Sequence, residues 1–228
     1  MGLRPELVAH RTGALWLPEH RTLIAADLHL GYGFAQRRRG ELGPVVEGGV
    51  AGRLAAAVAE FAPARVVLLG DLYHAARPSA AEQRMIDAAL SAITGELVIV
   101  QGNHDRAMLR DLRRAPVAEW RAPGIVAVHG DRIPVTDDYL IVGHFHPVVK
   151  LEDAAGVVRR YPVFVIGDRA CVLPAFSPFS AGMPWRRLPF SVGGAPRLVA
   201  ATGKRAVALG ARQPLGRGSR SAARATND

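Results

Sequence analysis

The chain has 228 residues, of which 49% are hydrophobic, and its formal net charge is +9 at pH 7. This length fits one domain with a sizeable core, or one domain followed by a tail. A single cysteine, Cys171, excludes an internal disulfide framework and is typical of a reducing compartment. The sequence contains neither a recognisable signal peptide nor an apolar run of the ~20 residues that a membrane-spanning helix needs. We therefore expect a cytoplasmic protein.

Apolar runs alternate with helical patterns along the chain, which predicts an α/β fold. Ser79 and Glu82 have the spacing of a capping box at the start of one expected helix. The sequence from residue 156 onward is richer in strand patterns and ends in an expected hairpin over 197–210. The other expected strands lie at 14–17, 22–26, 65–70, 96–100, 124–130 and 139–144, and the expected helices lie at 45–61, 79–93 and 105–114.

Residues 1–210 are interpreted as a single domain and residues 211–228 as a basic, disordered tail. The tail carries four arginines against one acidic residue, Asp228. It is either a nucleic-acid-binding arm whose affinity falls steeply with salt, or a solvated end. The basic balance of the whole chain likewise has two interpretations. It is typical of proteins with polyanionic partners, and it also follows from a composition rich in alanine, glycine and arginine.

Polar side chains follow most of the expected strands, at the point where each strand ends. Several of these strands finish at a glycine that is directly followed by a polar residue, as in GD, GNHD and GH. In an α/β sheet, ligands bind beyond the carboxyl ends of the strands, so we interpret these side chains as one site. In chain order they are Asp27, His29, Asp71, Asn103, His104, Asp105, His129, His144 and His146.

The donor types in this series predict a metal centre. Carboxylate, amide and imidazole donors together suit Mn, Fe or Zn, and the number of donors suits two ions with a shared carboxylate. Asp71 is the natural bridge because it stands alone after its strand. Side chains alternate along an extended chain, so Asp-x-His and His-x-His are each expected to place both donors on one side. Any single position could instead be a helix cap or a core residue, but the ordered series is not explained that way.

The ordered motifs DLH, GD, GNHD, HG and GHFH resemble those of the calcineurin-like metallophosphoesterase superfamily, over residues 27–146. The resemblance implies a four-layer α/β sandwich, in which two mixed β-sheets are flanked by helices. It also implies that His104 contacts the scissile phosphate and assists the leaving group, and that Asp105 orients His104. The implied ligands are Asp27, His29, Asp71 and His146 for one metal, and Asp71, Asn103, His129 and His144 for the other.

Two further stretches, ADLHLGYGFAQRRRG (26–40) and LPAFSPFSAGM (173–183), are similar to small bacterial phosphoesterases associated with DNA ligase and a DNA helicase. That subgroup consists of DNA damage-response endonucleases, and the resemblance covers residues 10–185. It implies phosphodiester hydrolysis on DNA, a link to DNA repair, and a possible ligase or helicase partner. The mixed N and O donors favour two Mn²⁺ ions, with Fe, Zn and Mg as alternatives.

Residues beside the metal motifs are candidates for substrate binding. Arg37 and Arg38 could contact backbone phosphates, or they could form a solvated charge run on a basic loop or at the start of a helix. His74 follows Asp71 by three residues and could reach the substrate. Tyr32 and Phe34 could stack on a base, or they could belong to the core or a lid.

Three functions remain open on these motifs. The first is a metal-dependent nuclease or phosphodiesterase that acts on DNA. The second is a phosphatase or phosphodiesterase of small phosphate esters such as nucleotides, which would use the same metal ligands. An open basic groove would favour the first function, and a closed pocket would favour the second. The third is a non-catalytic scaffold, a class that typically loses metal ligands or the GNHD histidine, whereas this sequence keeps all of them.

Overall fold

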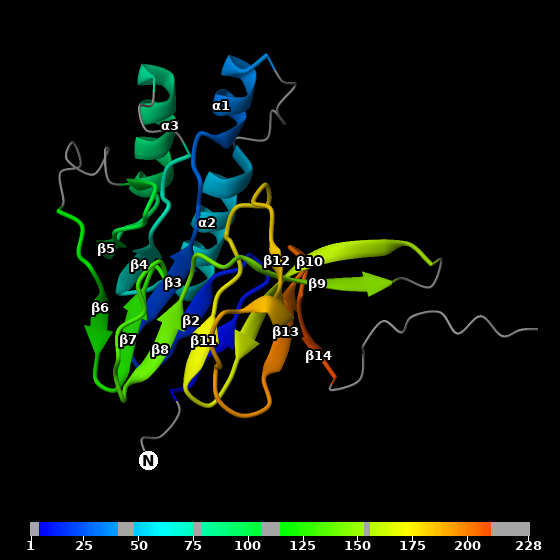
Figure 1. Cartoon of the computed structure of the whole chain (residues 1–228). Helices are drawn as coiled ribbons and strands as arrows, with labels where there is room; N and C mark the ends of the chain where they lie inside the picture. The colour runs from blue at the N-terminus through cyan, green and yellow to red at the C-terminus, as the bar shows by residue number, and fades with distance from the viewer. Residues whose placement is uncertain (1–4, 41–47, 75–78, 106–114, 153–155, 211–228) are drawn as a thin grey trace, which may run out of the picture.

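The computed structural model describes residues 5–40, 48–74, 79–105, 115–152 and 156–210. Figure 1 shows two β-sheets, with the helices gathered on one side of the molecule. The first sheet has the strand order β1-β2-β3-β4-β5, and β3, β4 and β5 run parallel, so their carboxyl ends lie at one edge. The bounds of its strands are β1 (Val8–Ala9), β2 (Leu15–Leu17), β3 (Thr22–Ala26), β4 (Arg65–Leu69) and β5 (Glu96–Val100).

The second sheet has nine strands, and its main path runs β12-β9-β10-β11-β8-β7-β6, with β13 paired to β10 and to β14. Strands β7, β8 and β11 are parallel to one another, whereas β9 and β10 form an antiparallel ribbon. The bounds are β6 (Trp120–Ala122), β7 (Ile125–Val128), β8 (Tyr139–Val142), β9 (Pro147–Glu152), β10 (Val158–Ile166), β11 (Ala170–Val172), β12 (Met183–Pro184), β13 (Arg197–Ala201) and β14 (Ala206–Leu209).

Strand β3 is buried on both faces, which explains why its sequence, TLIAA, is apolar without alternation. Leu23 packs in a core with Leu54 and Ile86, which come from α2 (Gly48–Phe61) and α3 (Ala80–Ser91). Ile24 faces the other way and packs in the core between the two sheets. A shorter helix, α1 (Tyr32–Arg38), follows β3 through a short loop.

The core between the sheets joins residues of both. Leu69 and Val100 from the first sheet pack there with Ile141, Phe164 and Cys171 from the second. Cys171 is fully buried, and this burial raises the pKa of its thiol to about 12, as expected of a core residue. On the outer face of the second sheet, the segment that contains the 3-10 helix η3 (Trp185–Arg187) packs against β10 and β11.

The predicted α/β fold with two mixed sheets is confirmed. The strands expected at 22–26, 65–70 and 96–100 are β3, β4 and β5, and the hairpin expected over 197–210 is β13–β14. The capping box of Ser79 and Glu82 is present at the start of α3. Among the described helices, none is both long enough and apolar enough to cross a membrane.

The structure differs from the prediction at α1 and at four strands, of which β1 and β12 have only two residues each. Residues 32–38, interpreted as part of a basic loop, form α1. The strands β6 and β9 were not predicted: β6 has only three residues, and β9 begins at Pro147 and carries Lys150 and Glu152, so neither has a clear apolar pattern. The expected helix at 105–114 and the basic tail at 211–228 lie outside the described residues, except for Asp105.

Candidate metal centre

One group of metal-ligand candidates lies beyond the carboxyl ends of β3 and β8. The ligand atoms of Asp27, His29 and His146 all lie within 4.8 Å of one another. Asp27 Oδ1, His29 Nδ1 and His146 Nε2 are buried and have no hydrogen-bond partner. A buried polar atom without a partner costs ~1–3 kcal/mol, so three at one point are difficult to explain by the polypeptide alone. A divalent cation would satisfy all three, and the mixed oxygen and nitrogen donors fit one.

A second group lies beside it and consists of Asp71, His129 and His144. The His129 Nε2 atom lies 3.1 Å from His144 Nδ1, 3.6 Å from Asp71 Oδ1 and 3.0 Å from Asn103 Oδ1. The other ring nitrogen, Nδ1, is 3.1 Å from the Leu69 carbonyl oxygen, to which it can donate. In that tautomer Nε2 offers a lone pair, as the nearby oxygens of Asp71 and Asn103 do. A cation among these atoms could therefore be held by all three.

The two groups adjoin. His129 Nδ1 lies 3.6 Å from Asp27 Oδ1, and the backbone N–H of His144 donates to Asp27 Oδ2 over 2.8 Å. All seven predicted metal ligands therefore lie at one edge of the two sheets, with Asn103 beside the second group. Asp71 lies in the second group by its distances, so its role as a bridge between two ions remains a prediction.

Left-handed backbone conformations position most of these side chains. Non-glycine residues rarely adopt positive φ, yet five of the seven that do so in the described ranges belong to this centre. Each strand thus stops before its donor residue, so neither motif is extended. Asp27 and His29 still lie in one group, as expected, whereas the expectation that His144 and His146 share one side is wrong. The five residues are Asp27 (57°), His29 (45°), Asp71 (46°), His144 (66°) and His146 (44°).

Glycines in the motifs make room for this convergence. A Cβ atom on Gly102 would overlap the backbone nitrogen and Oδ1 of Asp71. Gly70 has φ +66°, and a Cβ atom there would lie 2.5 Å from Cγ of the His129 ring. Only a residue without a side chain fits these two positions, which explains why GD and GN stand at the ends of β4 and β5.

Burial sets the charge of the imidazoles. It lowers the pKa of His29 to about 4, so this ring is neutral near neutral pH and offers a lone pair to a metal. Burial and the neighbouring His129 lower the pKa of His144 as well. Burial also acts against protonation of His146, but the carboxylate of Asp27, 3.3 Å away, outweighs it and raises that pKa. A metal ion bound here would compete with the proton for the lone pair of His146.

The GNHD loop contributes His104 and Asp105 in different ways. The His104 ring is exposed at the rim, with Nε2 4.0 Å from Asp71 Oδ2, and its backbone N–H donates to Asp71 Oδ1 over 3.1 Å. The buried Asp105 carboxylate accepts hydrogen bonds from the backbone of Gly102 (3.1 Å) and of Leu72 (3.0 Å). Asp105 thus ties the loop after β5 to the loop after β4, and its support of His104 passes through the backbone.

Two of the residues predicted to contact substrate, His74 and Tyr32, lie on the side of the first group. The ring of His74 lies 5.8 Å from that of His29 and 4.7 Å from that of Tyr32, measured between centroids. Tyr32 also stacks on Phe179, with centroids 5.4 Å apart and rings 7° from parallel. Phe179 was not predicted as a site residue, because its distance from Tyr32 in the sequence gives no signal of contact. Arg37 is exposed on α1, whereas the side chains of Phe34 and Arg38 lie outside the described part of the chain.

Comparisons with known proteins agree with this geometry. Residues 20–171 match the sequence model of the calcineurin-like phosphoesterase family. Among solved structures, the crystal structure of the nuclease MPE from Pseudomonas putida is similar to this chain, with a TM-score of 0.67 and 26% sequence identity. The similarity covers 90% of this chain and 95% of that chain. A comparison with curated proteins gives no match.

The close approach at Gly102 gives a prediction about metal binding. We expect Gly102→Ala to push Asp71 away and to lower both bound metal and hydrolysis of an aryl phosphodiester by at least about tenfold, as displaced ligands commonly do. The matched control is Gly52→Ala in α2, where a Cβ atom meets nothing within 4 Å. Elemental analysis after dialysis against Mn²⁺ measures the first effect. Full metal content and full activity in Gly102→Ala would contradict the packing argument.

Proposed function

Because the chain belongs to the calcineurin-like phosphoesterase family, we propose that it is a two-metal DNA nuclease that works in DNA repair. The chain is a metal-dependent phosphoric ester hydrolase. The observation that carries the proposal is the pair of adjoining donor groups, the first of which holds three buried atoms without a hydrogen bond. The similarity to a nuclease supports nucleic acid as the substrate.

The donors are proposed to hold two ions that share Asp71. Mixed oxygen and nitrogen donors make Mn²⁺ the first choice, with Fe, Zn and Mg as alternatives. When bound, such ions neutralise the charge of a phosphodiester and activate a water molecule for attack on phosphorus. The ligands are Asp27, His29, Asp71 and His146 for one ion, and Asp71, Asn103, His129 and His144 for the other.

His104 is proposed to act on the ester itself. It stands at the rim with 66% of its side chain exposed, and its backbone N–H is fixed on Asp71, so its ring can meet a phosphate bound at the two groups. When protonated, the ring can stabilise charge on the phosphoryl oxygens or give a proton to the departing oxygen. Asp105 keeps the loop that carries His104 in place.

The β9–β10 ribbon, defined as Pro147–Glu152 with Val158–Ile166, supports DNA as the substrate. It begins directly after His146 and projects from the body of the molecule in Figure 1. Lys150 and Arg160 lie opposite each other on it, and both are exposed. Exposed cations beside a hydrolytic centre bind backbone phosphates whatever the base sequence. Arg37 and Arg38 on α1 are proposed to add to this binding, and His74 to contact the substrate near His29.

The cavity beside His129 gives some support to the alternative, hydrolysis of small phosphate esters such as nucleotides, because it is large enough to admit them. Both functions use the same metal ligands. The link to repair, and association with a DNA ligase or helicase, rest on the resemblance of residues 26–40 and 173–183 to the repair-associated subgroup. Substrate assays separate the two functions.

The proposal predicts chelator-sensitive DNA cleavage. With Mn²⁺, the purified chain should hydrolyse an aryl phosphodiester and cut single- or double-stranded DNA, and a chelator should abolish both activities. Cleavage is followed by gel electrophoresis and by release of the aryl alcohol, with an aryl phosphomonoester in parallel. Turnover of aryl esters with DNA left intact would favour the small-ester alternative.

A charge reversal on the β9–β10 ribbon is the control for the DNA substrate. In Lys150→Glu/Arg160→Glu, the ratio of DNA cleavage to aryl diester hydrolysis should fall, and DNA binding should depend less steeply on salt because two phosphate contacts are lost. The matched variant Arg169→Glu/Arg197→Glu, at the far end of β10, should keep the wild-type ratio. An unchanged ratio of DNA cleavage to aryl diester hydrolysis in the ribbon variant would show that the ribbon is not part of the DNA-binding surface.

Replacement of His104 separates chemistry from metal binding. His104→Ala should keep the metal content of the wild type and slow hydrolysis by about 10²–10⁴-fold, as loss of a general acid does. Metal content is measured by elemental analysis, and the pH dependence of kcat is compared with that of the wild type. Loss of metal from His104→Ala would identify His104 as a ligand instead.

A further inference from the structure

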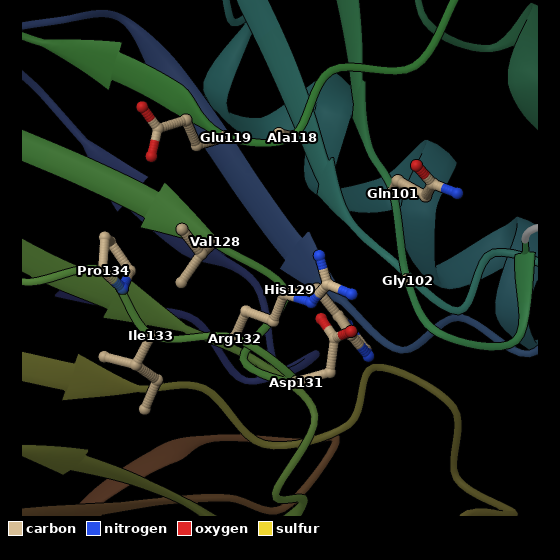
Figure 2. A pocket seen from close by; sticks show the side chains of 10 residues that line it. All are labelled: Gln101, Gly102, Ala118, Glu119, Val128, His129, Asp131, Arg132, Ile133 and Pro134. Atoms are coloured by element: carbon tan, nitrogen blue, oxygen red, sulfur yellow. The ribbon is translucent and has the colours of Figure 1, made fainter.

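A cavity of about 420 Å³ lies beside His129, and its lining includes no residue of the first donor group. Figure 2 shows it between the end of β5, the start of β6 and the loop after β7. Its volume falls within the range of small-molecule binding sites. Neither the hydrolytic chemistry nor the metal ligation described above uses this space, except at the ring of His129.

One side of the cavity adjoins the second donor group, because His129 and Gly102 line it. Asp131 and Arg132 also line the cavity and bring one charge of each sign to it. Figure 2 shows the Arg132 side chain extending from its loop toward the side where His129 and Gly102 lie. Among the described residues, no hydrogen bond or ion pair occupies the Arg132 guanidinium. A guanidinium with free donors beside a metal centre is a phosphate-binding group.

The remaining walls combine apolar and polar residues, as a nucleoside site does. Ile133 and Pro134 are apolar, and the polar residues of these walls are Gln101 and Glu119. One Glu119 oxygen is held by Arg121 Nε over 2.6 Å, so this carboxylate is fixed and its charge is partly compensated. A nucleobase has apolar faces and an edge of donors and acceptors, and it matches such a wall better than inorganic phosphate does.

We propose that this cavity binds the nucleoside next to the scissile phosphate, and that Arg132 contacts the following phosphate of the same strand. The inference rests on the proposed function, and it names which part of a polynucleotide is held, and where. It places the strand across the second donor group, with one phosphate at the metal ligands and the next at Arg132. A substrate without a nucleoside on this side would leave the cavity empty.

Inhibition of aryl phosphodiester hydrolysis tests the proposal in the full-length, Mn²⁺-loaded chain. The probes are a deoxynucleoside 3′,5′-bisphosphate, which carries a nucleoside and two phosphates, and inorganic phosphate, which has no nucleoside and cannot span the metal ligands and Arg132 at once. The bisphosphate should inhibit at a concentration about tenfold or more below that of phosphate, since it adds a charge-assisted contact. Arg132→Ala and Ala118→Phe, which fills the cavity, should each raise the bisphosphate inhibition constant about tenfold and leave that of phosphate unchanged.

Arg197→Ala, an exposed arginine at the far end of the second sheet, is the control and should change neither constant. Equal inhibition by the two probes in the wild type, or equal effects of both variants on both probes, would overturn the proposal. If the wild type is inhibited as expected but leaves DNA intact, the nuclease function fails while the cavity stands as a nucleotide site. If DNA is cut and the variants have no effect on inhibition, the cavity proposal alone fails.

Discussion

The backbone turns at the carboxyl ends of the strands are the constraint on which this site depends. Asp27, His29, Asp71, His144 and His146 all adopt left-handed conformations, each of which costs ~1–3 kcal/mol for a non-glycine residue. Neighbouring strands hold these turns: the backbone of His29 donates to the Asp71 carbonyl oxygen over 2.9 Å. Strands β3 and β4 are buried on both faces, with one core on each side. The turns that follow these strands therefore cannot relax without disturbing two cores. Local strain is thus maintained by packing that extends across the whole fold.

The same turns concentrate polar atoms that the polypeptide does not satisfy. Asp27 Oδ1 is fully buried between His29, His129 and His146, and it has no hydrogen bond. Metal ions bound at such a point would compensate both the desolvation of the carboxylates and the strain of the turns, so we expect metal binding to stabilise the fold. The donors lie at the edge of the sheets, where substrate can reach them. The exposed ring of His104 and the cavity beside His129 lie next to them.

Much of this arrangement could be predicted from the sequence, because strand ends and donor types are local features. The runs TLIAA, VVLL and ELVIV mark buried strands, and the glycine-polar pairs after them mark the site. The family resemblance implied that His144 and His146 serve different metals, whereas the His-x-His spacing alone placed both on one side, because the pattern does not encode the left-handed φ angles. Contacts between distant segments, such as Tyr32 with Phe179 or Asp105 with Leu72, are likewise set by tertiary packing. Short or polar strands such as β6 and β9 were not predicted, because they are stabilised by pairing with neighbouring strands and not by the strand propensity of their own residues.

Anomalous diffraction from crystals grown with Mn²⁺ tests the central claim most directly. The account predicts two manganese peaks per chain, one bounded by Asp27, His29 and His146 and the other by Asp71, His129 and His144, with Asn103 against the second. The Asp71 carboxylate should contact both ions. A single peak, or peaks away from these side chains, would contradict a two-metal centre built by the turns at the strand ends.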